Sequence, residues 1–460
     1  VKCVLQVGWC NDSFVLPDQV IGPSKDHIIF QSGERHFEEY TIAGTVDGWR
    51  TEISEPAIGN PLFVLALSLS FSGPLLFKCH MDGGGIHFVG DSSTGKTTLI
   101  EAACSVWGGS NFRRSWRTTA NGLEGAAAMF NDGLLALDEI SECNPSEVGS
   151  IIYSLGNGRG KQRASRTGSA RAIVRWRCSV LSSGERSIDT TMLEGGSKIK
   201  TGQTVRLLNL PVSRKHGAWD NLHKHGSGAA FSDAIKQASI SHHGLVGREF
   251  LEKLTHDQRD FSALLEQFKS HSAFSSEGCE GQYKRVASRL ALIAMAGELA
   301  TEYGLTGWSK GDAINAAAEA LKLWNSLNGS ENNERRQVLE QVADFVDKNC
   351  DSRFSGIIKN AKDGGYSYID GDQARVNQRA GYWFLEDVAG QQARMYLFNA
   401  PAMREALRGF DFDKALDVLE EADAFPLGRD TKGCRSKTFR IRGDQARFYQ
   451  VNASKLRDQN

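Results

Sequence analysis

Residues 90–97 read Gly90-Asp91-Ser92-Ser93-Thr94-Gly95-Lys96-Thr97, directly after the apolar run Ile86-His87-Phe88-Val89. The run predicts a buried strand and Thr97 to Trp107 predicts a helix, so the Gly-rich segment joins a strand to a helix N-terminus. In that context the N–H groups of the loop and the N-terminus of the helix favour the binding of a phosphate group. Lys96 is expected to neutralise the β- and γ-phosphates, and the hydroxyl of Thr97 is expected to bind Mg²⁺. The expected ATP-binding residues are Gly90, Asp91, Ser92, Ser93, Thr94, Gly95, Lys96, Thr97 and Thr98.

A second buried strand ends in two acids. Leu134-Leu135-Ala136-Leu137 is followed by Asp138-Glu139. In a P-loop ATPase one acid at this point holds the Mg²⁺ shell and the next polarises water. We therefore expect Asp138 and Thr97 to bind Mg²⁺ and Glu139 to activate water, with Lys96 completing the catalytic set. A glutamate here favours hydrolysis over phosphoryl transfer to a small molecule.

Further strands are predicted after these two. Ile173–Leu181 is followed by Ser182-Ser183, and Val205–Leu210 is another strand, in which Arg206 leads into Leu207–Leu210. Strands that alternate with helices favour a mostly parallel α/β sheet. If the strand ending near residue 182 lies beside the two acids, Ser182 or Ser183 reaches the γ-phosphate; the alternative is a plain strand end.

Three arginines are candidates for a contact to nucleotide held by a neighbouring subunit. Arg206 stands at a strand start, where an arginine finger raises the rate by about 10³–10⁵. Arg186 is a rival for that role, and a surface Arg is the alternative. Arg285 opens the clearest helix of the chain, Tyr283 to Tyr303, and is a candidate for the same nucleotide or a solvated charge.

The segment between Glu147 and Glu185 holds no acid. A Thr-Gly-Ser turn near its middle is flanked by basic residues, which predicts a hairpin that follows a phosphate backbone. The alternatives are a solvated basic loop and contacts to acids of a neighbouring subunit. The expected DNA-binding residues are Lys161, Arg163, Arg166 and Arg171.

The composition limits which other classes of protein the chain can belong to. The formal net charge is −1, so any affinity for nucleic acid comes from local clusters. Nine cysteines occur without a CxxC pair, which favours reduced thiols in a cytoplasmic protein without structural zinc. The apolar run 62–77 is short for a membrane span and predicts a buried helix. The chain begins with Val, as a fragment of a longer polypeptide does.

Changes in pattern along the chain predict four parts. Residues 1–60 are rich in short strands, and 61–228 hold the α/β ATPase core. Residues 229–330 have long helical periodicity, which predicts a helical lid subdomain. Residues 335–456 alternate short helices with strands, which predicts a small α+β module of winged-helix type.

The residues now in view resemble the bacterial family known as domain of unknown function 927. The likeness covers about residues 1–300, and such proteins occur on phages, plasmids and integrative elements, often beside primase modules. It rests on Gly8-Trp9, Phe14 to Pro17, Gly44 to Trp49, Gly90 to Thr97, Ser115 to Glu124, Leu137 to Glu139, Gly156 to Gly158, Gly160-Lys161 and Leu181 to Glu185.

The resemblance implies an AAA+ ATPase related to the minichromosome-maintenance (MCM) helicases. In MCM-like proteins a basic hairpin precedes a strand similar to Arg177–Leu181, an arginine finger stands where Arg206 does, and a winged helix follows the ATPase. Two positions depart from the pattern. The sensor is usually Asn where this chain has Ser182 or Ser183, and the Ser-Arg-Phe-Asp setting of the finger is absent around Arg206.

These features together predict an ATP- and Mg²⁺-dependent DNA helicase or translocase of a mobile element. It is expected to act as a homo-oligomeric ring, a hexamer, on single-stranded or forked DNA, with a primase module in cis or in trans and no membrane. Two alternatives remain. A protein-remodelling AAA+ ATPase predicts aromatic, apolar pore loops, and an ATP-switched DNA-binding initiator predicts little DNA-stimulated turnover.

Overall fold

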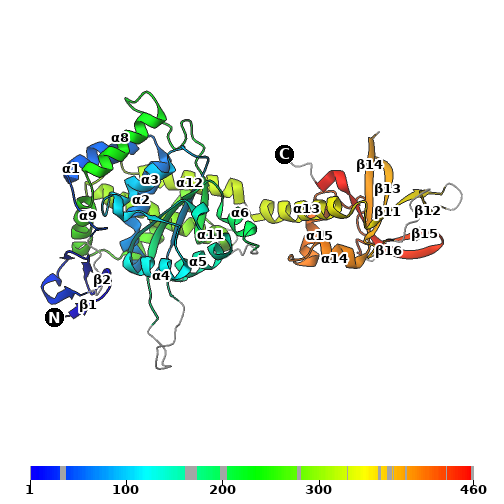
Figure 1. Cartoon of the computed structure of the whole chain (residues 1–460), viewed down its shortest axis with the longest axis horizontal. Coiled ribbons are helices and arrows are strands. Elements are labelled where there is room, and N and C mark those ends of the chain that lie inside the picture. The colour runs from blue at the N-terminus through cyan, green and yellow to red at the C-terminus, as the bar shows by residue number, and fades with distance from the viewer. Residues whose placement is uncertain are drawn as a thin grey trace. The chain divides into compact units, whose positions relative to one another are not determined.

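The structure is a computed structural model, and it describes residues 2–31, 38–160, 173–196, 205–276, 281–328, 330–360, 364–369, 376, 378–388, 391–430 and 433–456. The chain forms two compact units, Val1–Leu327 and Asn328–Asn460 (Figure 1). Each unit has its own hydrophobic core.

A five-stranded parallel sheet forms the centre of the N-terminal unit, with the order β10-β6-β9-β8-β7. Its strands span Gly84–Val89 (β6), Arg114–Ser115 (β7), Gly133–Asp138 (β8), Cys178–Gly184 (β9) and Leu207–Pro211 (β10). Almost every residue of β6, β8 and β9 is buried, which explains why they read as continuous apolar runs. β9 lies between β6 and β8, and its Ser182 pairs with His87 and with Leu137.

Helices flank both faces of this sheet. α2 (Pro61–Lys78) contacts β8 and β9 together with α3 (Lys96–Cys104) and α11 (Gly281–Glu302). α4 (Ala120–Met129), α5 (Pro145–Asn157) and α6 (Ile188–Glu194) contact one another in sequence. Right-handed crossovers put α3 on one face and α4, α5 and α6 on the other, because the chain reverses direction along the sheet after β7.

α2 confirms the buried helix expected from the apolar run at 62–77. Among the described residues it is the helix with the length and composition to cross a membrane, and 83% of that stretch is buried inside the structure. Gly73 lets α2 approach the backbone of Gly133 at the start of β8 more closely than a Cβ atom would permit. The helix is therefore part of the core that supports the sheet.

Short strands and helices complete the N-terminal unit. β2 (Gly8–Cys10), β3 (Ser13–Val15) and β4 (Val20–Ile21) form an antiparallel sheet, while β1 (Lys2–Val4) and β5 (Ile28–Phe30) pair in parallel. The indole N–H of Trp9 donates to the carbonyl of Pro74 in α2, so this region packs on the core. Other α-helices in the described part of this unit are α1 (Val46–Trp49), α8 (Gly228–Ser241), α9 (Leu245–His256), α10 (Phe261–Lys269) and α12 (Asp312–Asn328).

The C-terminal unit contains a closed six-stranded barrel with the order β11-β12-β15-β16-β14-β13. The strands are β11 (Phe354–Lys359), β12 (Tyr366–Tyr368), β13 (Gly381–Val388), β14 (Gln391–Phe398), β15 (Lys437–Ile441) and β16 (Asp444–Asn452). Apolar side chains such as Phe384, Met395 and Phe439 fill its interior.

Three helices cover the barrel of the C-terminal unit: α13 (Ser330–Asn349), α14 (Ala400–Ala406) and α15 (Phe412–Glu421). A winged helix was expected over residues 335–456, and this expectation is not confirmed in that form. A barrel forms because β11 pairs in parallel with β13, and β12 bridges β11 to β15. These pairings are non-local, and the local pattern of residues does not encode them.

Candidate functional site

The Gly-rich segment joins β6 to α3, as the sequence predicts. Gly95 stands before the first residue of α3 with φ 95°, and Ser93 has φ 62°, a conformation that is uncommon for a residue with a side chain. Gly90 lies against the backbone of Val212, and Gly95 against Ala218 and Trp219. The segment after β10 therefore packs against the loop and fixes its path.

Lys96 is 7% exposed, and its ammonium points back into its own loop. Its Nζ donates to the carbonyl of Gly90 at 2.6 Å and to that of Asp91 at 2.5 Å. A buried ammonium with two carbonyl partners has one N–H donor left for an anion. By contrast Asp91, Ser92 and Ser93 are exposed, and Thr98 is buried.

Asp138, Thr97 and Ser183 come together at the carboxyl edge of the sheet. The Thr97 hydroxyl lies 3.4 Å from Asp138 Oδ1, and Ser183 Oγ donates to the same oxygen at 2.5 Å. Ser183 reaches Asp138 because β9 is inserted between the loop strand β6 and the acid strand β8. A carboxylate beside a threonine hydroxyl is an oxygen donor set that suits Mg²⁺.

Arg113 is part of this site, a role that the sequence did not assign to its basic cluster. Its guanidinium pairs with Asp138 Oδ2 at 2.9 Å and with Glu101 Oε1 at 3.2 Å. Burial raises the pKa of Glu101, and the charge of Arg113 opposes that shift. The signal in the sequence was the basic pair Arg113-Arg114 two residues before Trp116, but only the pairing of β7 with β8 brings it to Asp138.

Glu139 has a left-handed backbone with φ 58°, which is unfavourable for this residue type. Its backbone N–H donates to Ser183 Oγ at 3.2 Å. Its carboxylate accepts from the hydroxyl of Ser141 at 2.7 Å. The second acid is thus held by the short helical turn Ile140–Glu142 that follows it.

Ser182 lies on the other side of β9 from Ser183 and belongs to a buried hydrogen-bonded chain. Trp116 Nε1 donates to Ser182 Oγ at 2.9 Å, and Ser182 Oγ lies 2.8 Å from His87 Nδ1. His87 Nε2 lies 3.0 Å from the carbonyl of Arg186, which accepts only, so Nε2 carries the proton and Nδ1 accepts from Ser182. Burial lowers the pKa of His87 to about 4.

A hollow of about 310 Å³ lies beside the Gly-rich loop. Ser93 and Thr94 form one wall, His216 and Trp219 another, and Gly228 at the start of α8 closes it. The backbone N–H of Ala218 donates to the carbonyl of Thr94 at 2.7 Å, so the segment after β10 is tied to the loop. Nothing in the residue pattern had indicated His216 or Trp219 as neighbours of this loop.

Arg206 and Arg285 lie at the opposite, amino edge of the sheet and line one hollow of about 440 Å³. Arg206 precedes Leu207, which pairs with Gly85 at the start of β6. The six residues of β6 separate this edge from the Gly-rich loop by about 17 Å. Arg206 donates to Asn157 Oδ1 at 2.8 Å and stacks on Tyr153, while Arg285 is exposed.

Arg289 is buried in the wall of the same hollow, one turn after Arg285. Its guanidinium donates to the carbonyl of Gly83 at 3.1 Å, and burial lowers its pKa to about 10. The charge of Arg206 also lowers the pKa of Arg289, and both residues line the hollow. Lys284 adds a further cation, and Asp82 is the acid among the lining residues.

Arg186 is found elsewhere, after β9 at the carboxyl edge, and pairs with Glu194 of α6. This ion pair and its place at the carboxyl edge separate it from Arg206. Trp116, with no exposed surface, is a core residue.

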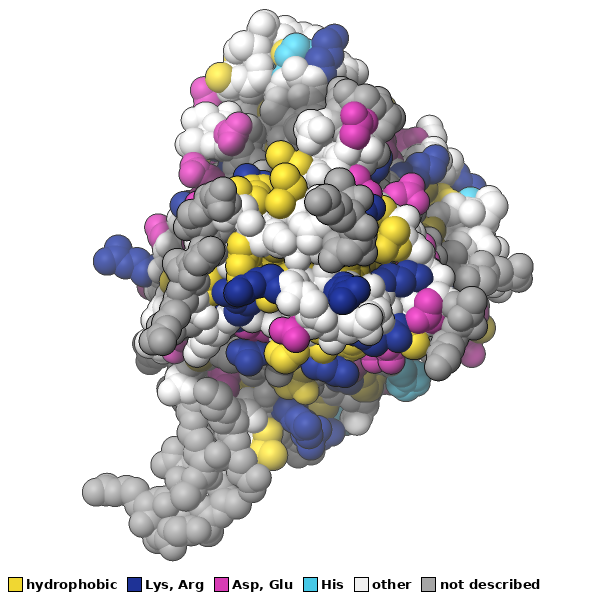
Figure 2. Space-filling model, turned by 90° about the vertical axis from the view of Figure 1, so that its right-hand side faces the viewer, with side chains coloured by type: hydrophobic (Ala, Val, Ile, Leu, Met, Phe, Trp, Pro, Cys, Tyr) yellow, Lys and Arg dark blue, Asp and Glu magenta, His cyan; other side chains and the backbone are white. Residues whose placement is uncertain are grey.

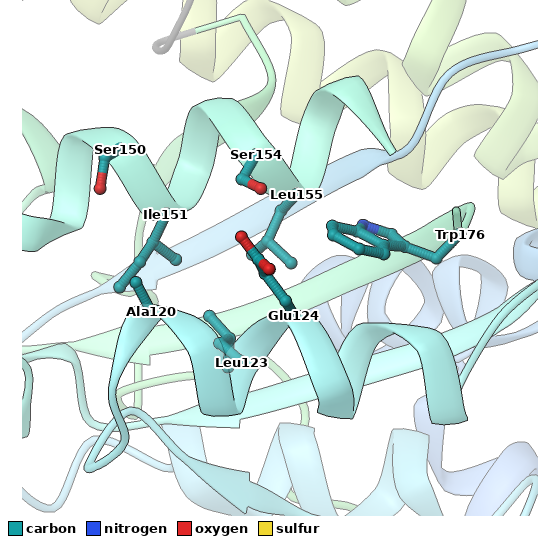
Figure 3. Close-up of a pocket in the computed structure, with 8 residues that line it drawn as sticks. All are labelled: Ala120, Leu123, Glu124, Ser150, Ile151, Ser154, Leu155 and Trp176. Atoms are coloured by element: carbon teal, nitrogen blue, oxygen red, sulfur yellow. The ribbon is translucent and has the colours of Figure 1, made fainter. Parts of the chain in front are cut away.

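The root of the basic segment is ordered by backbone contacts. Arg159 and Arg175 form an antiparallel bridge, Gly160 N–H donates to Val174, and Trp176 N–H donates to Gly158. Glu124 points from α4 toward α5 beside Trp176 and Ser154, in a small pocket at this root (Figure 3). The four predicted DNA-binding residues, Lys161, Arg163, Arg166 and Arg171, lie outside the described residues.

Residues 1–175 match the family model for a domain of unknown function, DUF927. No curated protein matches the chain. Among solved structures the chain is similar to SCCmec type IV Cch, an active helicase, with a TM-score of 0.66 and 20% identity. The match covers 99% of this chain and 81% of that one. The chain therefore has a mixed α/β fold with a parallel sheet flanked by helices, similar to the fold of that helicase.

Proposed function

We propose that this chain is an ATP-dependent DNA helicase or translocase of a mobile genetic element. The observation that carries the proposal is the division of charge across the sheet. Lys96, Thr97, Asp138 and Ser183 meet at the carboxyl edge, while Arg206 and Arg285 share a hollow at the amino edge. Such a division suits a ring in which each nucleotide lies between two subunits.

The carboxyl edge would hold ATP and Mg²⁺. The N–H groups of the loop from Gly90 to Thr98 bind phosphate, and Lys96 neutralises it. Thr97 and Asp138 hold Mg²⁺, which balances phosphate charge when bound. Glu139 orients the attacking water after its carboxylate has released the Ser141 hydroxyl. Ser183 holds Asp138 and the backbone of Glu139 together through its hydroxyl. The hollow beside Trp219 and His216 suits the base.

The amino edge would complete the nucleotide site of the next subunit. About 17 Å of sheet separates Arg206 from the loop of its own subunit, which is too far for one side chain to span. Arg206 therefore acts in trans if it acts on nucleotide, and Arg285 is available from the same hollow. This reasoning favours a homo-oligomeric ring, which we take to be a hexamer in the cytoplasm.

Further support comes from three features. The strand order, with β9 between the loop strand and the acid strand, suits an AAA+ ATPase related to MCM helicases. One solved structure of similar fold, SCCmec type IV Cch, is an active helicase. The backbone ladder at the root of the basic segment suits a hairpin, with Lys161, Arg163, Arg166 and Arg171 on a DNA strand and a primase module as partner in cis or in trans.

The C-terminal unit fits an elaborated winged helix. α13, β14, α14, α15 and the hairpin β15–β16 follow the order helix, strand, helix, helix, hairpin, and β14 pairs with β16. In this proposal β11, β12 and β13 are additions that close the sheet into the barrel.

The test is ATP turnover by the full chain with and without single-stranded DNA. The proposal expects stimulation by DNA, and a loss of about 10²-fold or more in Lys96→Ala. Glu139→Gln is expected to bind ATP without turning it over. The paired change Lys161→Ala with Arg163→Ala is expected to weaken DNA binding and leave basal turnover in place.

Three results would count against the proposal. Turnover by Lys96→Ala removes the ATPase assignment. ATP binding without DNA-stimulated turnover assigns the chain to the ATP-switched initiators. DNA affinity that is unchanged in the paired variant removes the hairpin assignment.

A further inference from the structure

Two tyrosines and two arginines form a compact cluster on the barrel of the C-terminal unit. Tyr368 and Tyr382 have ring centroids 6.2 Å apart, and Arg379 lies 5.4 Å and 5.1 Å from them. Arg442 lies 5.3 Å from the ring of Tyr368. We call these four residues the Tyr368 cluster. Its base is rigid, because Tyr382 also packs edge-on against Phe448 inside the barrel.

The arginines of the Tyr368 cluster differ in their partners from four other arginines of this unit. Arg353, Arg429, Arg435 and Arg447 each pair with a carboxylate. Among the residues that the structure describes, no ion pair is recorded for Arg379 or Arg442. Two guanidinium groups that share one tyrosine ring repel each other, and a bound anion would relieve that repulsion.

Arg442 has a backbone conformation that does not suit it. It has φ 52° and Gly443 has φ 91°, and together they form the two-residue turn between β15 and β16. Asn-Gly is the favoured sequence for a turn with two positive φ values, so arginine in the first position costs stability. The Arg442 N–H donates to the carbonyl of Tyr366, which fixes the exposed turn beside the cluster.

A third arginine of the barrel also stacks on an aromatic ring. Arg394 lies 4.2 Å from the ring of Trp383, and it pairs across the strands with Leu385, which is 56% exposed. Figure 2 shows Lys and Arg side chains gathered across the middle of the face that it draws, with hydrophobic side chains between them. Arg394 therefore places a cation beside an exposed apolar side chain of the barrel.

We propose that the Tyr368 cluster binds single-stranded nucleic acid, with Arg379 and Arg442 on phosphates and Tyr368 beside a base. Guanidinium groups already ordered on aromatic rings lose little entropy when their outward N–H groups bind phosphate. Half-buried aromatic rings stack with unpaired bases, which a duplex does not offer. An acidic protein would match the cations but not the rings. The inference rests on the proposed function and adds a second DNA contact outside the ATPase unit.

The experiment measures binding of fluorescein-labelled oligothymidylate to the full chain by anisotropy over a range of salt. Arg379→Gln with Arg442→Asn is expected to lower affinity about tenfold and to reduce the salt slope by about 1.4, as two lost phosphate contacts do. Arg442→Asn improves the turn sequence, so loss of folding does not explain the effect. Tyr368→Leu is expected to weaken binding about fivefold or more through lost stacking.

The matched control is Arg336→Gln with Arg404→Gln, which makes the same change of charge in the same unit. Arg336 pairs with Glu340 on α13, and Arg404 stacks on Phe412. Affinity is expected to stay within about twofold, and basal ATP turnover to stay unchanged in every variant. An equal loss of affinity in the control would show that only net charge matters, and it would overturn the inference. Tighter binding of duplex DNA or of an acidic peptide than of oligothymidylate would also overturn it.

The two proposals fail in different ways. If oligothymidylate binds and stimulates turnover while the cluster variants behave like the wild type, the proposed function stands and this inference falls. If the wild-type chain neither binds oligothymidylate nor responds to it, the proposed function falls as well.

Discussion

Ser182 and Ser183 are neighbours in the sequence, yet their hydroxyls bind on opposite sides of β9. Ser183 donates to Asp138, while Ser182 links Trp116 to His87 inside the core. The residue pattern left both serines open as the sensor, because side chains alternate along a strand and the neighbours of each side are set by the sheet. The geometry favours Ser183 for the nucleotide site.

This difference gives a paired prediction. Ser183→Ala is expected to lower ATP turnover about 10-fold to 100-fold with little change in thermal stability, because Asp138 loses a partner at the site. Ser182→Ala is expected to keep turnover and to destabilise the fold by about 2 kcal/mol, because buried donors and acceptors on Trp116 and His87 lose theirs. Turnover assays and thermal melts of both variants check this, and the reverse pattern would contradict the assignment.

His87 makes the stability of the fold depend on pH. Its pKa is about 4 in the folded chain and near 6.5 when unfolded, so between these values the unfolded chain binds more protons. Stability from neutral His87 is complete above pH 6.5 and falls as pH decreases toward 4, by about 3 kcal/mol in total. His87→Gln is expected to lack this component. Urea melts of both proteins from pH 7 to pH 4 measure it, and parallel curves would refute it.

Among the elements, α5 shows how helix packing positions Arg206, the proposed finger. Arg206 crosses α5 at Gly156, where a Cβ atom would collide with the arginine side chain. Tyr153 and Asn157 of the same helix hold its guanidinium. Arg206 therefore needs a residue without a side chain at position 156. A helix interior otherwise favours alanine over glycine.

Gly156→Ala is accordingly expected to displace Arg206 and to lower turnover of the assembled protein about tenfold, although alanine raises helix propensity. Gly125→Ala in α4 is the control, because no atom lies near the added methyl group there. It is expected to stabilise the chain by about 0.5–1 kcal/mol with no change in turnover. Equal turnover in the two variants would show that the position of Arg206 does not matter.

At the scale of the whole molecule, the two edges of the sheet predict complementation between subunits. Lys96→Ala removes the proposed phosphate-binding lysine from one edge, and Arg206→Ala removes the proposed arginine finger from the other. Each variant alone is expected to be inactive, whereas a mixture forms some junctions with an intact Lys96 and an intact Arg206. Turnover of mixtures at several ratios checks this, and a mixture no more active than its parts would exclude action in trans.

The N-terminal unit was more accessible to sequence reasoning than the C-terminal one. β6, β8 and β9 are continuous apolar runs that end at chemically distinctive residues, so local spacing was enough to outline the sheet. The barrel depends on pairings between segments far apart, such as Tyr366 with Ile441 and Gly381 with Phe354. Local patterns allow several such pairings, so the residue pattern predicts a plain winged helix and not the barrel.

By itself the sequence determined the strand–loop–helix at Gly90 to Thr98 and the acids at the end of β8, because those features lie within a few residues of one another. Only the tertiary structure decided which serine faces Asp138, that Arg113 joins it, and that Arg206 and Arg285 share one hollow. Those contacts join segments about 25 to 80 residues apart, and only the packed sheet brings them within reach.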